Sequence, residues 1–213
     1  MKKVSREELK ERYGDEEVLV IAKEDLPALA EGFTKGSKKV FEDLFEDTYF
    51  IKRWESDYNP EEVEIIPYPI LKNMEGNKVF CTKRIEGSNE ERLIGNLSLG
   101  VGGHVNPAGG MEGIDLINYS LQRELTEELM ILPSAIGNTY MMPQGFIRVT
   151  DSTVDKDHLG LLYKVAIQDK YCNDLYVKIR EADTLEGKFE DIKYLKDNYE
   201  KLEEWSKIVV DNL

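Results

Sequence analysis

One stretch, residues 109–131 with the sequence GGMEGIDLINYSLQRELTEELMI, constrains this chain more than any other. Its second half is expected to form a helix of about fourteen residues, because aliphatic residues recur at every fourth position from 117 to 125. Glu124 and Glu128 follow members of that apolar stripe by steps of three and seven residues. Such steps return to the same side of a helix, so both carboxylates are expected on the shoulder of the buried face.

Two carboxylates on the shoulder of a buried face call for a cation. They are held close together and half withdrawn from water, so they repel one another unless a positive charge joins them. A hard divalent ion with oxygen ligands removes this repulsion. The alternative is that residues 123–129, RELTEEL, form only a solvated helix, because the chain is rich in glutamate and short motifs give false positives.

The same residues resemble the Nudix box, the signature of the Nudix hydrolases. That box reads G-x5-E-x7-R-E-U-x-E-E-x-G-U, where U is a bulky aliphatic residue. Here Gly109 opens the pattern, Asp115 follows after five residues, and the R-E-L-T-E-E core begins at Arg123 after seven more. Two positions depart from the pattern. Asp115 replaces a glutamate, and Met130 replaces the glycine that ends the helix, where a left-handed backbone would strain methionine.

The resemblance implies a metal-dependent reaction. Nudix hydrolases cleave a nucleoside diphosphate linked to another moiety, and their catalysis is mostly charge neutralisation and alignment. It implies that Glu124, Glu127 and Glu128 bind Mg²⁺, with Mn²⁺ as the alternative ion. The main-chain carbonyl of Ala108 or Gly109 is expected to add a ligand.

The resemblance also assigns catalytic roles. Arg123 is expected to brace the loop and Glu124 rather than to contact substrate. Glu124 is a candidate for orienting the attacking water, although family members differ in which carboxylate does so, and Glu127 stands beside it.

A fourth carboxylate is expected from a late loop that precedes an aromatic residue at the start of the final helix. Phe189 is the candidate aromatic, and both Glu181 and Glu186 precede it. We favour Glu181 as the metal ligand, because an alternating strand over residues 175–180 would hold it rigidly.

Other assignments stay open at this point. Two further classes are a Nudix module that binds a nucleotide without cleaving it, and an isoprenoid diphosphate isomerase on the same fold. The intact carboxylates argue against the first class, and for the second Cys81 is the only thiol near the right strand. His104 and His158 are expected to be structural. Four basic residues are candidates for phosphate or base recognition, and the sequence does not choose among them: Lys83, Arg84, Arg92 and Arg148.

Charge and composition narrow the partners. A formal charge of −14 argues against binding long nucleic acid, whose phosphates need a basic surface. No apolar stretch approaches a membrane span, and the first residues lack the apolar run of a secretory signal, so we expect a cytoplasmic protein. Cys81 and Cys172 are expected to remain unpaired in a reducing compartment.

The expected fold is α/β. Residues 61–213 are expected to form a Nudix-type α/β/α sandwich with a mixed sheet between helices, and residues 1–60 an N-terminal α/β extension. The strand that begins near residue 63 contains two prolines, which suggests a sheet edge or the start of a strand. Residues 18–21 and 40–45 offer more apolar surface than an idle extension needs, so we expect the extension to form a homodimer.

Overall fold

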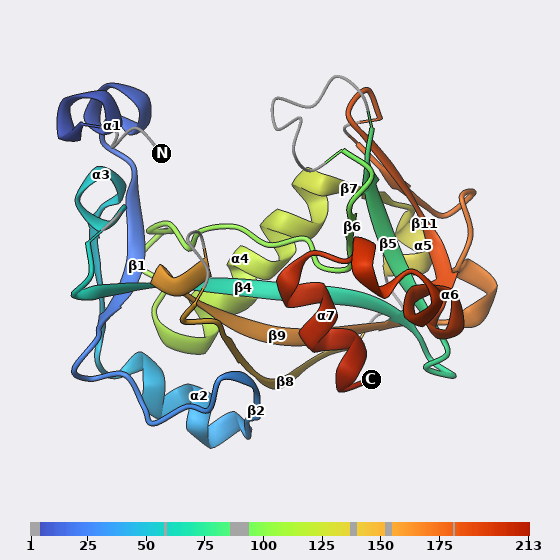
Figure 1. Cartoon of the computed structure of the whole chain (residues 1–213), viewed down its shortest axis with the longest axis horizontal. Coiled ribbons are helices and arrows are strands. Elements are labelled where there is room, and N and C mark those ends of the chain that lie inside the picture. The colour runs from blue at the N-terminus through green and yellow to red at the C-terminus, as the bar shows by residue number, and fades with distance from the viewer. Residues whose placement is uncertain (1–4, 58, 86–93, 137–139, 152–154, 181) are drawn as a thin grey trace. The chain divides into compact units, whose positions relative to one another are not determined.

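We describe the protein from a computed structural model, shown in Figure 1. The described residues are 5–57, 59–85, 94–136, 140–151, 155–180 and 182–213. The chain divides into two compact units that alternate along the sequence. Unit 1 comprises Met1–Pro67, Gly103–Ser120 and Gly145–Leu161, and unit 2 comprises Tyr68–Gly102, Leu121–Gln144 and Leu162–Leu213.

Most strands belong to one large mixed sheet, which confirms the expected α/β class. Within the described residues its strands are β1 (Glu17–Ala22), β2 (Gly32–Lys35), β3 (Thr48–Lys52), β4 (Glu62–Asn73), β5 (Lys78–Arg84), β6 (Leu97–Ser98), β8 (Tyr140–Arg148), β9 (His158–Ile167) and β11 (Leu185–Asp191). The hydrogen-bonded order is β11-β5-β4-β9-β8-β2, with β1 beside β3 and β4, and β6 beside β5. A separate pair joins β7 (Leu129–Ile131) to β10 (Val177–Ile179) in unit 2.

The helices follow local signals in the sequence. Ser5 and Glu8 form the capping box that opens the first helix, with hydrogen bonds of 2.7 and 3.2 Å. Among the described residues no helix is long and apolar enough to cross a membrane. The α-helices are α1 (Arg6–Tyr13), α2 (Lys38–Phe45), α3 (Arg53–Ser56), α4 (Gly113–Glu128), α5 (Pro133–Ile136), α6 (Ile192–Asp197) and α7 (Glu204–Asp211), and the 3₁₀ turns are η2 (Asp155–Asp157), η3 (Asp169–Tyr171) and η4 (Tyr199–Lys201).

The N-terminal residues of unit 1 pair directly with strands from later in the chain. β1 pairs with β3 and with the first residues of β4, and β2 pairs with β8. The apolar side chains of β1 are buried, and Phe41 of α2 stacks on Phe146 with ring centroids 4.5 Å apart. The apolar surface that motivated the homodimer is therefore largely consumed inside the chain. The homodimer stays a prediction.

β4 corrects the expectation of a sheet edge, because it lies between β5 and β9 in the strand order. Its prolines, Pro67 and Pro69, fall between the residues that pair with β1, which end at Glu64, and the pairing with β5 at Lys72. Proline has no N–H to donate to a neighbouring strand. Both prolines lie between the residues that pair with β1 and the residue that pairs with β5, so neither pairing requires an N–H from them. The carbonyl of Pro69 still accepts a hydrogen bond from the N–H of Val101 at 3.2 Å.

In unit 2, residues 185–191 form a strand where the sequence suggested a loop. β11 pairs with β5 at seven successive positions, from Leu185 opposite Arg84 to Asp191 opposite Lys78. Phe189 therefore lies inside a strand and contacts Phe80 edge-to-face, with centroids 5.3 Å apart, rather than opening a helix. The tail of the chain is not one continuous helix, because η4 separates α6 from α7.

The end of α4 differs from the glycine-terminated box. Met130 lies in β7, an extended strand, so its backbone is not left-handed and the expected strain is absent. Arg180 provides the cap instead. Its N–H donates to the carbonyl of Glu128 at 2.8 Å, and its Nε donates to the carbonyls of Thr126 at 2.6 Å and Leu129 at 3.2 Å. These bonds satisfy carbonyls that a helix end leaves without partners.

Candidate functional site

The loop that leads into α4 uses glycine where the backbone is left-handed. Gly109 and Gly113 both have φ of 54°, a region that only glycine enters without strain. Between them a turn forms in which the carbonyl of Ala108 accepts a hydrogen bond from the N–H of Met111 at 2.8 Å. That carbonyl keeps its second lone pair for a ligand. Asp115 is exposed in the first turn of α4.

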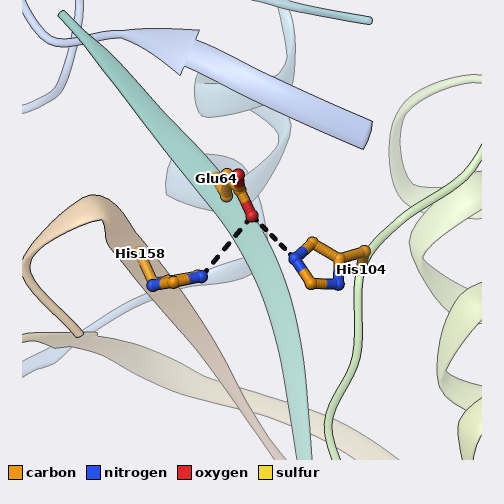
Figure 2. Close-up of side chains that lie close together, drawn as sticks. All are labelled: Glu64, His104 and His158. Carbon is orange, nitrogen blue, oxygen red and sulfur yellow. Dashed lines mark ion pairs between the residues drawn. The ribbon is translucent and has the colours of Figure 1, made fainter. Parts of the chain in front are cut away.

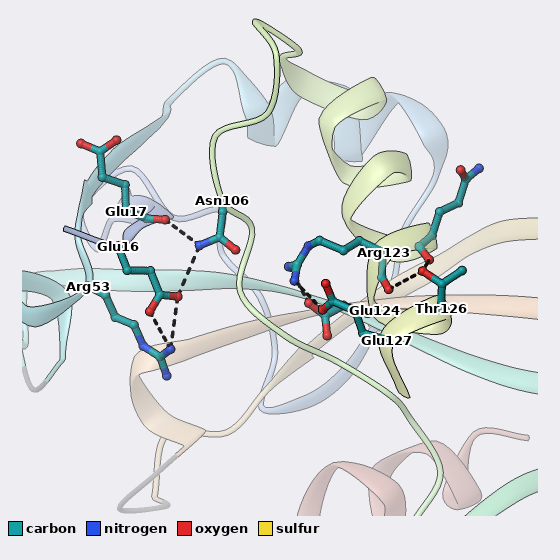
Figure 3. Close-up of polar contacts among 9 residues, drawn as sticks. Glu16, Glu17, Arg53, Asn106, Arg123, Glu124, Thr126 and Glu127 are labelled. Carbon is teal, nitrogen blue, oxygen red and sulfur yellow. Dashed lines mark hydrogen bonds and ion pairs between the residues drawn. The ribbon is translucent and has the colours of Figure 1, made fainter. Parts of the chain in front are cut away.

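In unit 2, one guanidinium holds two of the box carboxylates. Nη2 of Arg123 lies 2.5 Å from Oε1 of Glu124, and its Nη1 lies 2.8 Å from Oε2 of Glu127 (Figure 3). The two acids differ in environment, since Glu124 is 6% exposed and the Glu127 side chain is 57% exposed. Arg123 therefore neutralises a buried carboxylate and a solvated one at the same time.

Glu128 lines a cleft of about 130 Å³ in unit 2. The cleft is also lined by residues 100–102 and by Arg84 and Glu203. Nε of Arg84 lies 3.5 Å from Oε1 of Glu203. Carboxylates and a guanidinium in one small cleft are groups that bind a metal ion together with phosphate oxygens.

Sequence reasoning missed Glu203. It lies just before α7, and no motif in the sequence marks it. Glu186 lies elsewhere, in a second unit 2 cleft of about 290 Å³ that Cys81 and Lys83 also line. Its carboxylate is 3.9 Å from Nζ of Lys83. Glu181, our expected fourth ligand, lies outside the described residues, as does Arg92.

Arg148 is buried in unit 1, and its guanidinium is hydrogen-bonded to main-chain carbonyls. Its Nη1 donates to the carbonyl of Lys156 at 2.7 Å and to that of His158 at 2.9 Å. Burial lowers the pKa of Arg148, although the nearby carboxylate of Glu31 opposes this. Of the four basic candidates, Arg84 is the one that shares a cleft with a box carboxylate in the described part of unit 2.

Unit 1 contains a cluster that sequence reasoning did not assemble. Glu64 of β4 lies between His104 and His158 (Figure 2). Its Oε2 is 2.7 Å from Nε2 of His104 and 3.4 Å from Nε2 of His158. Burial by itself would raise the pKa of Glu64, but the two imidazoles outweigh it and hold that pKa well below its usual range. The one signal in the sequence was that these are the chain's only two histidines.

Comparisons with known proteins agree with the box and the fold. The sequence matches no family model. It is 31% identical to Protein YmaB of Bacillus subtilis (strain 168) over 166 residues. This alignment covers 76% of this chain and 77% of YmaB. The structure superposes on the crystal structure of Tm1382, a candidate Nudix hydrolase, with a TM-score of 0.73 and 25% identity, over 92% of this chain and 97% of Tm1382.

A more distant match is the Nudix domain of NrtR from Shewanella oneidensis, solved with ADP ribose, at 14% identity and a TM-score of 0.47 over 69% of this chain and 83% of NrtR. That similarity is too low to carry a conclusion about this chain's ligand. The alignment with Tm1382 extends over almost the full length of both proteins, and the box motif lies where the sequence placed it, at the start and along the length of α4. The chain belongs to the Nudix hydrolase family.

Proposed function

We propose that the protein is a Mg²⁺-dependent hydrolase that cleaves the pyrophosphate bond of a nucleoside diphosphate linked to another moiety. The observation that carries this proposal is the unit 2 cleft, in which Glu128 of the box shares a small space with Arg84, Glu203 and the backbone of residues 100–102. The formal charge of −14 favours a small substrate that arrives with its metal ion over long nucleic acid.

The donor set fits Mg²⁺, which prefers carboxylate and carbonyl oxygens. Glu124, Glu127 and Glu128 would hold the ion on α4, and it would supply charge neutralisation at the phosphate oxygens and a more acidic bound water. Glu203 lines the same cleft as Glu128, which makes it our choice for the fourth carboxylate in place of Glu181.

The chain's own side chains bind and align the substrate. The Arg84 guanidinium presents hydrogen-bond donors that match phosphate oxygens, and Glu203, 3.5 Å away, holds it in position. Arg123 fixes the rotamers of Glu124 and Glu127 before substrate arrives, so less ordering is required in the transition state.

The structure bears differently on the two alternatives, an isoprenoid diphosphate isomerase and a non-catalytic binding module. For an isomerase, Cys81 would have to exchange protons near neutral pH. Burial, reinforced by the charge of Glu190, raises the pKa of Cys81 to about 12, so the thiol is a poor acid there. Neither Cys81 nor Cys172 forms a disulfide, as expected. A non-catalytic binding module remains the second candidate, because it would bind the same nucleotides without turnover.

The test is turnover of a panel of nucleoside diphosphate derivatives and isopentenyl diphosphate, each with Mg²⁺ and with EDTA. Glu128→Gln keeps the shape of the side chain and removes its charge, so turnover should fall by about a hundredfold or more while the fold persists. Glu186→Gln is the matched control, because Glu186 lines the other cleft. Nucleotide binding without turnover, or activity unchanged in Glu128→Gln, would contradict the proposal.

A further inference from the structure

The cluster of Glu64, His104 and His158 in unit 1 has no role in the proposed reaction. Its members come from three separate segments: β4, the loop before α4, and the first residue of β9. In the described part of the chain, it is the one group of three or more His, Cys, Asp or Glu side chains whose donor atoms all lie within 4.8 Å of one another. The box carboxylates do not meet that condition.

The geometry of the cluster matches that of ligands around one ion. Both imidazoles present Nε2 to the same carboxylate oxygen, at 2.7 and 3.4 Å (Figure 2). Ligands bound about 2.0–2.2 Å from a tetrahedral ion are themselves about 3.3–3.5 Å apart, so only a small outward movement of His104 is needed. The rings lie at 61° to one another with centroids 6.2 Å apart, so they converge at their edges rather than stack.

The buried carboxylate of Glu64 is held, among the described side chains, by uncharged or titratable groups and not by a permanent cation. Its Oε2 is buried, and the side chains of His104, His158 and Ser56 interact with the carboxylate. Glu64 is 3% exposed, and within the described residues its ion pairs are with the two histidines and with no lysine or arginine. A buried carboxylate is costly unless a positive charge compensates it, and a divalent ion bound between these three side chains would supply that charge.

We propose that Glu64, His104 and His158 bind one divalent first-row transition-metal ion of the Zn²⁺ type, at a site made of different residues from the box. Two imidazole nitrogens and one carboxylate are a donor set that suits Zn²⁺ and its neighbours, whereas Mg²⁺ prefers oxygen alone. Three protein ligands leave a coordination position for water or a substrate oxygen. The His104 and His158 side chains are 18% and 24% exposed, which gives that position access to solvent.

The bound ion would also order the start of the box loop. His104 lies shortly before the turn at Ala108 and Gly109, and the ion would tie it to β4 and β9 within unit 1. This inference does not depend on the proposed hydrolysis, because it concerns different residues and is tested without substrate.

The experiment is a titration of untagged, metal-stripped full-length protein with Co²⁺, followed by its visible absorption, and then by competition with Zn²⁺ and with Mg²⁺. We expect one Co²⁺ per chain, displaced by Zn²⁺ and not by millimolar Mg²⁺. His104→Gln and His158→Gln should each weaken binding about a hundredfold or more, whereas Glu186→Gln, in the other unit 2 cleft, should leave it unchanged. Circular dichroism of each variant establishes that it is folded.

A second readout needs no variant. The chain has two histidines, so the imidazole NMR signals of the wild-type protein report on both ligands directly. One equivalent of Co²⁺ should shift both sets strongly. The proposal is overturned if no Co²⁺ binds, if the histidine signals stay in place while Co²⁺ binds, or if Glu128→Gln abolishes binding and the histidine variants do not.

Discussion

The two clusters of charged side chains in this protein compensate buried negative charge in different ways. On α4 the buried carboxylate of Glu124 has an internal cation, because Arg123 of the same helix turns back to it. In unit 1 the buried carboxylate of Glu64 has two imidazoles and, among the described residues, no guanidinium or ammonium group. The first arrangement is stable without an added ion, whereas the second is completed by one.

This difference determines which kind of ion each cluster suits. The box offers carboxylate oxygens on one helix, the ligand type that a hard ion prefers. The unit 1 cluster offers two nitrogens that a hard ion does not need. The predictions below test whether the charge compensation on α4 is internal, and they run from the largest expected effect to the smallest.

Replacing Arg123 with methionine should have the largest effect, because it removes the internal cation that distinguishes the box from the unit 1 cluster. Glu124 would lose the guanidinium that compensates its buried charge, and the free energy of unfolding should fall by about 2 kcal/mol. Millimolar Mg²⁺ should restore part of that loss in the variant, since the ion takes over the compensation. Chemical denaturation with and without Mg²⁺ measures both effects.

Glu127→Gln is the control for that measurement. It removes the exposed partner of Arg123, so the free energy of unfolding should change by less than about 0.5 kcal/mol. If Arg123→Met were as harmless as Glu127→Gln, the guanidinium would not be compensating Glu124.

Replacing Arg180 with methionine tests how α4 is held at its C-terminal end. The variant loses the hydrogen bonds from Nε to the carbonyls of Thr126 and Leu129, and stability should fall by about 1 kcal/mol. Lys178→Met, in β10 just before Arg180 and also exposed, is the matched control and should be nearly neutral. Equal melting temperatures for the two variants would mean that Arg180 does not cap the helix.

Met130→Gly should have the smallest effect on stability. It should destabilise the protein, whereas a helix that ended in a left-handed residue would be stabilised by glycine. Met130 lies in β7 and pairs with Lys178, so glycine there would add backbone entropy and cost about 0.5–1 kcal/mol. Thermal unfolding decides the sign. Stabilisation by glycine would show that the helix end prefers a left-handed residue after all.

The features that the sequence predicted well are local ones. The box helix rests on a spacing within one segment, and the structure has this helix over Gly113–Glu128. β11 was missed because its alternation of Leu185, Gly187 and Phe189 has glycine at its centre, and only its seven pairs with β5 make it a strand.

The features that the sequence did not predict depend on pairing between distant segments. Glu64 is embedded in an apolar strand where a lone acid gives no pattern, and its partners are found only when β4, β9 and the loop before α4 are brought together. Glu203 joins Glu128 in one cleft although the tail carries no motif. For the same reason Arg148, a candidate for phosphate recognition in the sequence, is buried and donates hydrogen bonds to carbonyls of its own unit.

The central claim is that the chain holds a hard-ion centre on α4 and a separate transition-metal centre on Glu64, His104 and His158. Anomalous scattering from crystals soaked with Mn²⁺, as a stand-in for Mg²⁺, and with Zn²⁺ tests it most directly. The account predicts a Mn²⁺ peak at Glu128 and a Zn²⁺ peak about 2.0–2.2 Å from both Nε2 atoms and Oε2 of Glu64. Zn²⁺ bound only at the box carboxylates, with the two imidazoles still in contact with Glu64, would contradict it.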